Sequence, residues 1–237
     1  MIIIILGSPG SGKGTQAELI SGSFNLRYFE TSKLLEDRFQ NASVDDFIEV
    51  DGQKFYSKKE KENWSNGLLV SPPFVTQLVI SEIHNLYQQK KEICFSGSPR
   101  TLYEGERVIP LLKELYGVAQ IKVIFLEVTQ EETIYRNSNR RLCELVRHPI
   151  LYSEETKNLN FCPIDGSRLL KREGLDDPET IKVRIKEFEK RTLPLLAFME
   201  KEGLSVIKIN GSQPPAVVFA EIRKVIMTAQ ATETDNK

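Results

Sequence analysis

Four short apolar runs recur along the chain, and segments with helical spacing separate them. The runs are Ile2–Leu6, Ile93–Ser96, Ile121–Val128 and Leu204–Ile209. Short apolar runs rich in β-branched residues are typical of buried strands, and alternation with helices is typical of βαβ units. The pattern therefore predicts an α/β fold built on a parallel sheet.

Capping signals mark where several helices begin. Ser71-Pro72 places a capping side chain before a proline of the first turn, and apolar positions at helical spacing follow. Thr129 with Glu132 forms a capping box after the third apolar run. The sequence Asp176-Asp177-Pro178-Glu179 opens another helix, which we expect to run to about Glu202.

Two stretches interrupt the alternation of strand and helix. Residues 31–70 are charged, and they carry a capping-box pattern at Ser57 that predicts a solvated helix. Residues 139–176 hold two cysteines, several arginines and turn residues. We expect both stretches to be insertions at the functional edge of the sheet, with a core formed by residues 1–30, 71–138 and 177–237.

Composition narrows the class of protein. The chain has 237 residues, 40% of them hydrophobic and 27% charged, with a net charge of −1. That balance predicts one large soluble domain with no broad basic field, so neither nucleic acid nor a membrane is an expected partner. The first apolar run is too short to span a bilayer or to act as a signal peptide. Three cysteines are an odd number for a disulfide framework, so we expect a cytoplasmic protein.

The first apolar run leads directly into GSPGSGKGT, residues 7–15. A phosphate-binding loop has the form G-x-x-x-x-G-K-[ST], but here Gly14 follows Lys13, and Thr15 comes one place late. Glycines let backbone N–H groups turn toward phosphate oxygens, and the helix N-terminus and the lysine add positive charge. An ordinary glycine-rich turn is the alternative, but the strand, the lysine and the helix together favour a phosphate-binding loop.

The loop and several later motifs resemble the adenylate kinase family along nearly the whole chain. The stretch Phe95–Thr101 (FSGSPRT) is similar to the family's D-G-F-P-R-T, and Ile209–Ser212 (INGS) is similar to its adenine-contacting turn. The resemblance implies a P-loop NTPase fold of three α/β/α layers. It also implies that residues 31–70 form the domain that binds the nucleoside monophosphate and that residues 139–176 form the lid of a long-form member.

The resemblance implies transfer of a phosphoryl group from MgATP to AMP, giving two ADP, with Mg²⁺ as the cofactor and a monomeric enzyme. In the family, magnesium sits mainly among phosphates and water, which would make a hydroxyl directly after the lysine less necessary. The implied ATP-binding residues are Gly10, Ser11, Gly12, Lys13, Gly14, Thr15, Arg136, Arg140, Gly211 and Ser212. The implied AMP-binding residues are Thr31, Lys33, Leu69, Val70, Gly97, Arg100, Glu104, Arg172 and Arg184.

The implied catalytic residues are cationic, because phosphoryl transfer between two nucleotides gathers negative charge at one point. By resemblance, Arg136 stacks on the donor adenine and Arg100 holds the acceptor phosphate. The residues that act on the transferring group are Lys13, Arg100, Arg140, Arg172 and Arg184.

Several family positions differ in this chain. Glu36 stands where the family has an arginine that grips the acceptor phosphate. Lys33 and Ser96 stand where it has two aspartates that hold the water shell of magnesium. Our hypothesis is that Lys33 or Arg38 supplies part of the missing positive charge; the alternative is that Lys33 merely pairs with Glu36 on the surface.

Glu104 stands where the family has a glutamine that reads the adenine edge. An ionised glutamate only accepts hydrogen bonds, so the acceptor base could instead be guanine or a pyrimidine. AMP is the first expectation, and GMP or CMP/UMP is the alternative. The departures at Lys33, Glu36 and Ser96 leave open a second alternative, a nucleotide-binding protein with little kinase activity.

Two cysteines of the second insertion resemble half of the family's zinc knuckle. Cys162 and Asp165 keep its C-x2-D half, whereas Val146 replaces a cysteine of the other half. We expect His148 to take that ligand role beside Cys143. These four side chains would form a closed, structural zinc site, and the alternative is two free thiols and a surface histidine.

Overall fold

A parallel sheet forms the centre of the molecule. The computed structural model describes residues 1–234 except residues 44, 67, 147 and 172–175. In the described chain the sheet has the strand order β10-β6-β1-β5-β2, and all neighbours are parallel. The strands are β1 (Ile2–Gly7), β2 (Arg27–Glu30), β5 (Ile93–Ser96), β6 (Ile121–Glu127) and β10 (Val206–Asn210).

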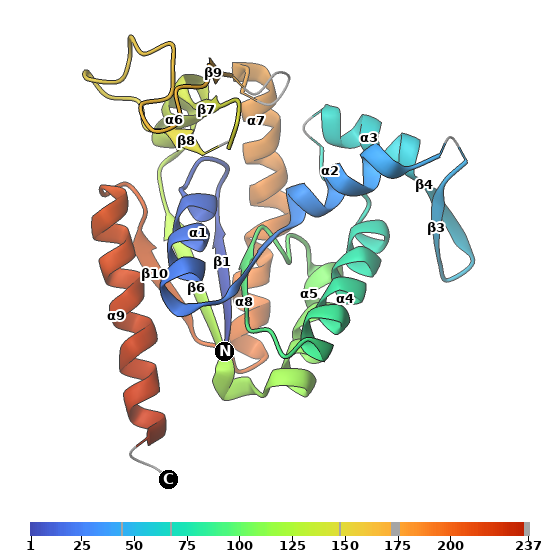
Figure 1. Ribbon diagram of the computed structural model, residues 1–237. Helices are drawn as coiled ribbons and strands as arrows, with labels where there is room; N and C mark the ends of the chain where they lie inside the picture. Colours follow the sequence, from blue (N-terminus) through green and yellow to red (C-terminus); the bar gives the residue numbers. More distant parts are fainter. Residues whose placement is uncertain (44, 67, 147, 172–175, 235–237) are drawn as a thin grey trace.

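Helices cover both faces of the sheet, as Figure 1 shows. Successive side chains of a strand point to opposite faces, so the unbroken apolar run of β1 can bury both. Ile2 and Ile4 join the cluster under α4 (Pro72–Gln88), α5 (Leu102–Tyr116) and α8 (Pro194–Lys201). Ile3 and Ile5 join the cluster under α1 (Lys13–Phe24) and α9 (Pro215–Thr234). The predicted three-layer α/β/α fold is confirmed.

The sequence pattern missed the edge strand β2. Arg27–Glu30 is only four residues long, and its side chains run from exposed to buried without a continuous apolar stretch. It pairs with β5 on one side, and its other edge has no neighbouring strand in the described sheet. Short edge strands need less apolar surface, which is why the pattern is weak.

The first insertion contains a hairpin that the helical reading of its charged run did not predict. Helix α2 (Thr31–Asn41) leads to β3 (Phe47–Val50) and β4 (Gln53–Tyr56), and α3 (Ser57–Ser65) follows. Asp51-Gly52 forms the turn with positive φ at both residues, the conformation that Asp-Gly favours in two-residue hairpins. The capping box predicted at Ser57 is wrong, because the helix begins at Ser57 and makes no side-chain cap.

The second insertion is a small antiparallel sheet. After α6 (Gln130–Asn139) come β7 (Arg141–Cys143), β8 (Pro149–Ile150) and β9 (Leu169–Leu170), in the order β8-β7-β9. Its buried cluster consists of Cys143, Ile150 and Cys162, with Leu169 packed against it. So small a core contributes little to stability, which is consistent with a need for an additional fastening.

The helix predicted to run from Asp176 to about Glu202 is not continuous. Asp177 caps α7 (Pro178–Glu187) by accepting hydrogen bonds from the N–H groups of Glu179 and Thr180 at 3.1 Å. A π-helical turn, Phe188–Thr192, then separates α7 from α8, because Pro194 has no N–H to continue the helical pattern. The predicted helix cap at Thr129 is confirmed, with its hydroxyl accepting from the N–H of Glu132, but the Glu132 side chain bonds Arg136 instead of completing the capping box. A short 3₁₀ helix, Val118–Gln120, precedes β6.

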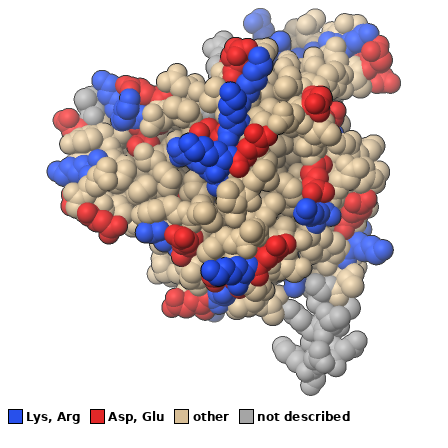
Figure 2. Space-filling view, turned by 180° about the vertical axis from the view of Figure 1, so that it is seen from behind, with Lys and Arg blue, Asp and Glu red and all other residues tan. Residues whose placement is uncertain are grey.

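The charged residues are mixed over the surface. Figure 2 shows acidic and basic side chains interspersed on the face opposite to that of Figure 1, with no large area of one sign. Among the described residues, no helix combines the length and the apolar character that crossing a bilayer requires.

Candidate active site

One cleft of about 1220 Å³ lies at the carboxyl ends of the parallel strands. Its walls come from the glycine loop, the ends of β2 and β5, helices α2, α6 and α7, and both insertions. Ligands bind at these strand ends in open α/β sheets. A typical small-molecule pocket has about 300–1,000 Å³, so the cleft is large enough for more than one nucleotide-sized ligand.

The side chain of Lys13 is bonded to the glycine loop that precedes it. The Nζ atom of Lys13 donates hydrogen bonds to the carbonyl oxygens of Gly7 at 2.8 Å and Ser8 at 2.7 Å. Gly10 has a φ of +80°, and a Cβ there would collide with the buried side chain of Asn137. Asn137 in turn donates to the carbonyl oxygen of Pro9 at 3.1 Å. No side chain caps the start of α1, so its first N–H groups face the cleft as a site for anions.

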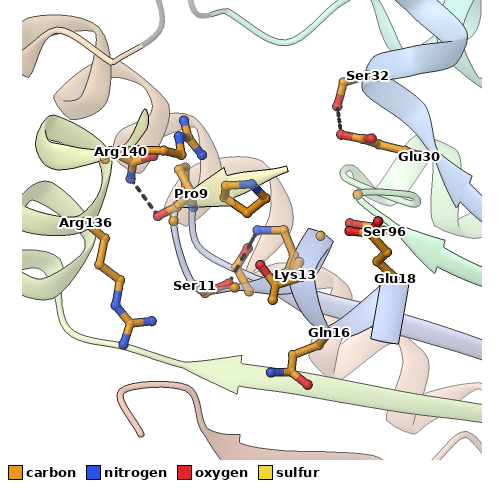
Figure 3. A pocket seen from close by; sticks show the side chains of 18 of the residues that line it. Pro9, Ser11, Lys13, Gln16, Glu18, Glu30, Ser32, Ser96, Arg136 and Arg140 are labelled. Atoms are coloured by element: carbon orange, nitrogen blue, oxygen red, sulfur yellow. Dashed lines mark hydrogen bonds between the residues drawn. The ribbon is translucent and has the colours of Figure 1, made fainter. Parts of the chain in front are cut away.

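Positive charges from distant segments meet in this cleft, as Figure 3 shows in part. Burial, and after it the nearby charges of Arg100, Arg184 and Arg140, together lower the pKa of Lys13 to about 7. These arginines lie after β5, on α7 and just after α6, and all of them line the same cleft. Cations gathered this closely around one cleft form a site for a polyanion. Arg172 lies outside the described residues.

Asp176 fixes two of the arginines, a role that the sequence pattern did not predict. Its carboxylate accepts a bond from Nε of Arg140 at 3.0 Å and a second from the same guanidinium, and it lies 3.8 Å from Arg184. Only 2% of the Asp176 side chain is exposed. The sequence did carry a signal for this role, because two acids, Asp176 and Asp177, stand before the helix. Asp177 alone caps α7, so Asp176 is available to bind the arginines.

Arg136 lies on another wall of the cleft and is tied to the turn after β10. Its guanidinium donates to the carbonyl oxygens of Gly211 at 2.8 Å and Ser212 at 3.2 Å, and its Nε bonds Glu132. The guanidinium plane and this turn therefore form two adjacent surfaces of the cleft. That is the arrangement expected around a flat base.

On the side of the first insertion, the residues expected to bind AMP fall into two groups, one that lines the cleft and one that is buried behind it. Lys33, Leu69 and Gly97 line the cleft together with Arg100. Thr31 and Val70 are buried behind that lining, and the hydroxyl of Thr31 donates to the carbonyl oxygen of Gly97 at 3.0 Å. They support the wall rather than form its surface.

Glu104 differs from the expectation that it faces a base. It does not line the cleft, and only 2% of it is exposed. Its carboxylate accepts hydrogen bonds from the N–H of Arg100 and the hydroxyl of Thr101, both at 3.1 Å. Burial raises its pKa, while these bonds and the Arg100 charge oppose the rise. Glu104 thus fastens the turn that carries Arg100, because it lies in the first turn of α5 and reaches back to an N–H that precedes the helix.

The two candidates for the missing positive charge also differ. Arg38 bonds Asp46 at 2.6 Å and does not line the cleft, whereas Lys33 is exposed within it. Of the two, Lys33 alone is placed to meet an anion. Trp64, which the sequence pattern did not single out, lines the same wall and packs against Phe39 with 6.1 Å between ring centroids.

The four expected metal ligands meet in the second insertion. Ligand atoms of Cys143, His148, Cys162 and Asp165 all lie within 4.8 Å of one another. The sulfur atoms of Cys143 and Cys162 are each 3.1 Å from a ring nitrogen of His148. Hydrogen bonds from Ser167 hold the pKa of Asp165 well below its usual value. The structure thus brings together the four side chains that the resemblance to the family's zinc knuckle singled out.

Comparison with known proteins places this geometry in a family. The family model for adenylate kinase matches residues 5–204. Adenylate kinase of Caldicellulosiruptor saccharolyticus is 32% identical, covering 95% of this chain and 99% of the relative. Adenylate kinase of Oceanobacillus iheyensis is 32% identical, with coverage of 95% and 99%. Adenylate kinase of Methanothrix thermoacetophila is 29% identical, with coverage of 97% and 100%.

These matches span both insertions as well as the core, and they agree with the cleft that gathers the loop lysine and three arginines. The resemblance found in the sequence motifs is thereby confirmed, and this chain belongs to the adenylate kinase family.

Proposed function

We propose that this protein transfers a phosphoryl group from MgATP to AMP and forms two molecules of ADP. The observation that carries the proposal is the convergence of Lys13, Arg100, Arg140 and Arg184 on one cleft large enough for two nucleotides. The glycine loop and Lys13 hold the ATP phosphates, and Arg136 with the turn at Gly211 borders the donor adenine.

Arg100 holds the acceptor phosphate on the opposite side of the cleft, and Arg140 and Arg184 act on the group in transfer. Transfer is direct and in line, so positioning and charge neutralisation supply most of the rate increase. The two insertions border the cleft and exclude water that would otherwise accept the phosphoryl group. Asp176 keeps Arg140 and Arg184 oriented before the substrates bind.

AMP is the acceptor that the family relationship favours. The case for a guanine or pyrimidine acceptor came from Glu36 and, for the base itself, from Glu104, whose carboxylate instead bonds the N–H of Arg100 and the hydroxyl of Thr101. A nucleotide binder without turnover is also disfavoured, because Lys13 lines the cleft together with Arg100, Arg136, Arg140 and Arg184.

A coupled assay of ADP formation tests the proposal. ATP is supplied with AMP, GMP, CMP or UMP in turn, and we expect the highest kcat/KM with AMP. The Lys13→Met variant serves as the control for contaminating kinases and should lose almost all turnover. Binding of ATP with no turnover on any monophosphate would contradict the proposal, and so would a preference for another base.

We also propose that the second insertion binds a structural zinc ion. The residues fit this metal: two thiolates, an imidazole and a carboxylate are a common tetrahedral set. One oxygen of Asp165 is bonded to Ser167, while the other, Oδ2, is buried and has no hydrogen-bond partner in the described structure. Tetrahedral zinc with bond lengths of about 2.0–2.3 Å places ligand atoms about 3.3–3.8 Å apart. His148 nitrogens lie 3.1 Å from each sulfur and 4.0 Å from Asp165, close to those values, and all four ligand atoms lie within 4.8 Å of one another.

Metal analysis of the purified protein tests the zinc proposal. We expect about one zinc per chain, lost in Cys143→Ser but retained in Cys94→Ala, whose cysteine lies in β5. Equal zinc content in both variants would contradict it.

We further propose that the enzyme is a cytoplasmic monomer, since its three cysteines form no disulfide and the face seen in Figure 2 has mixed charges. Light scattering after size-exclusion chromatography tests the oligomeric state.

A further inference from the structure

Two neighbouring strands end beside the glycine loop with different side chains. Strand β5, next to β1, ends at Ser96, and β2 beyond it ends at Glu30. The two residues are direct partners in the parallel register, and both line the cleft. The nearer strand therefore presents a neutral hydroxyl at this edge, and the next one presents a carboxylate.

Magnesium bound with ATP phosphates needs a carboxylate at such a place. The ion keeps several water molecules and is usually held by phosphates and one or two carboxylates. In P-loop enzymes it lies beside the residue after the loop lysine and near an acid from a neighbouring strand. In this chain the residue after Lys13 is Gly14, and the adjacent strand end is Ser96, so neither provides an acid.

The hydroxyl of Tyr28 connects Glu30 to this place. A Cβ on Gly14 would lie 3.5 Å from the Tyr28 oxygen, so the phenol stands directly against the loop. Burial raises the pKa of Tyr28 most, and the side chains of Glu30 and Ser96 lie close enough to the hydroxyl to influence that pKa as well. The carboxylate of Glu30 thus belongs to a polar cluster that begins at Gly14, where the metal of a P-loop enzyme is bound.

Other acids on the opposite wall are already engaged by arginines. Asp176 bonds Arg140, and Glu132 bonds Arg136. Figure 3 shows Glu30, hydrogen-bonded by Ser32 at 3.1 Å, on the other side of Lys13 from these arginines. Glu30 also influences Arg100, since its negative charge opposes the lowering of the Arg100 pKa by burial.

We infer that Glu30 is the positioning residue that holds the water shell of the magnesium ion bound with ATP, through Tyr28 and Ser96 at the end of the sheet. It supplies at the edge strand the negative charge that the neighbouring strand lacks. This inference rests on the proposed function, because it concerns the metal of the same donor nucleotide.

Binding measurements test the inference without requiring turnover. The affinity for a non-hydrolysable ATP analogue is measured by calorimetry with Mg²⁺ and again with EDTA, for the wild type and for Glu30→Gln. Removing a carboxylate that orients metal-bound water typically costs about 10–100-fold in metal affinity. We therefore expect the Mg²⁺-dependent gain in affinity to fall about 10-fold in Glu30→Gln, with affinity in EDTA unchanged.

The design separates the possible failures. The metal-free affinity reports whether the variant is folded, and Glu18→Gln, which removes an exposed acid of α1 that also lines the cleft, should keep the wild-type gain. Glu30→Asp, which keeps the charge with a shorter reach, should lie between wild type and Glu30→Gln. An unchanged gain in Glu30→Gln, or one that falls equally in Glu18→Gln, would overturn the inference. A wild type that binds no ATP would instead refute the proposed function.

Discussion

Protonation of Lys13 should couple ATP binding to pH. In the ligand-free protein, burial and three arginine charges bring the pKa of Lys13 to about 7. Bound phosphates supply the missing negative charge and should return the pKa toward its usual value of about 10.4. Between these two values the complex holds a proton that the free enzyme has partly lost, so binding takes up protons: about 0.5 at pH 7 and about 0.9 at pH 8.

The sign of the effect on affinity follows from the same argument. Only the protonated lysine attracts the phosphates, so ATP affinity should be constant well below pH 7 and fall by up to about tenfold per pH unit above it. Calorimetry of MgATP binding at pH 8, in buffers with different ionisation enthalpies, measures the proton uptake directly. The triphosphate is fully ionised at that pH, so the proton must go to the protein.

The Lys13→Arg variant provides the matched control, because a guanidinium stays charged over the whole range and should bind with no proton uptake. Zero uptake by the wild type at pH 8, or an affinity that does not change between pH 7 and pH 9, would refute the argument that burial and the arginine charges depress the pKa of Lys13.

Three further results are expected. Asp176→Asn leaves Arg140 and Arg184 without their buried counterion, so it should cost on the order of 3 kcal/mol, or roughly 6–12 °C in the melting temperature; it should also lower kcat more than it raises KM, and unchanged values of both would contradict this role. Chelation of zinc should expose Cys143 and its partner thiol to a thiol reagent, whereas in the metal-bound protein both should react slowly, and equal rates in the two states would argue against the site. Trp64 is the only tryptophan of the chain, so its fluorescence should change on adding AMP and remain nearly constant on adding inorganic phosphate; no change with AMP would place the acceptor elsewhere.

Most of the fold could be predicted from the unbroken apolar runs and the capping signals of the sequence. The strand β1 is buried on both faces, and a buried parallel strand reads in the sequence as an unbroken apolar run. The edge strand β2 and the hairpin of residues 47–56 were missed, because partly exposed strands need few apolar residues. In the hairpin, the Asp51-Gly52 pair is the sequence feature that predicts the turn, but the charged residues around it do not show the apolar alternation of strands.

The candidate site could be predicted where a residue type has one plausible chemical use. A lysine in a glycine loop, and cysteines spaced around a histidine, are of this kind, and the structure brings each group together. Glu104 was harder, because an acid in the first turn of a helix can face a ligand or satisfy the helix itself, and the sequence does not distinguish the two. The place of Glu30 depends on which strands are neighbours, which only the fold reveals.

The bond between Arg140 and Asp176 joins the two ends of the second insertion, since these residues lie 36 positions apart at its start and finish. It closes the base of this insertion with the guanidinium that we propose acts on the transferring group. The segment between the two residues can therefore change in length or sequence without moving Arg140 or Arg184. Evolution, or a protein engineer, could exchange most of the insertion as a module, provided that an arginine equivalent to Arg172 is kept.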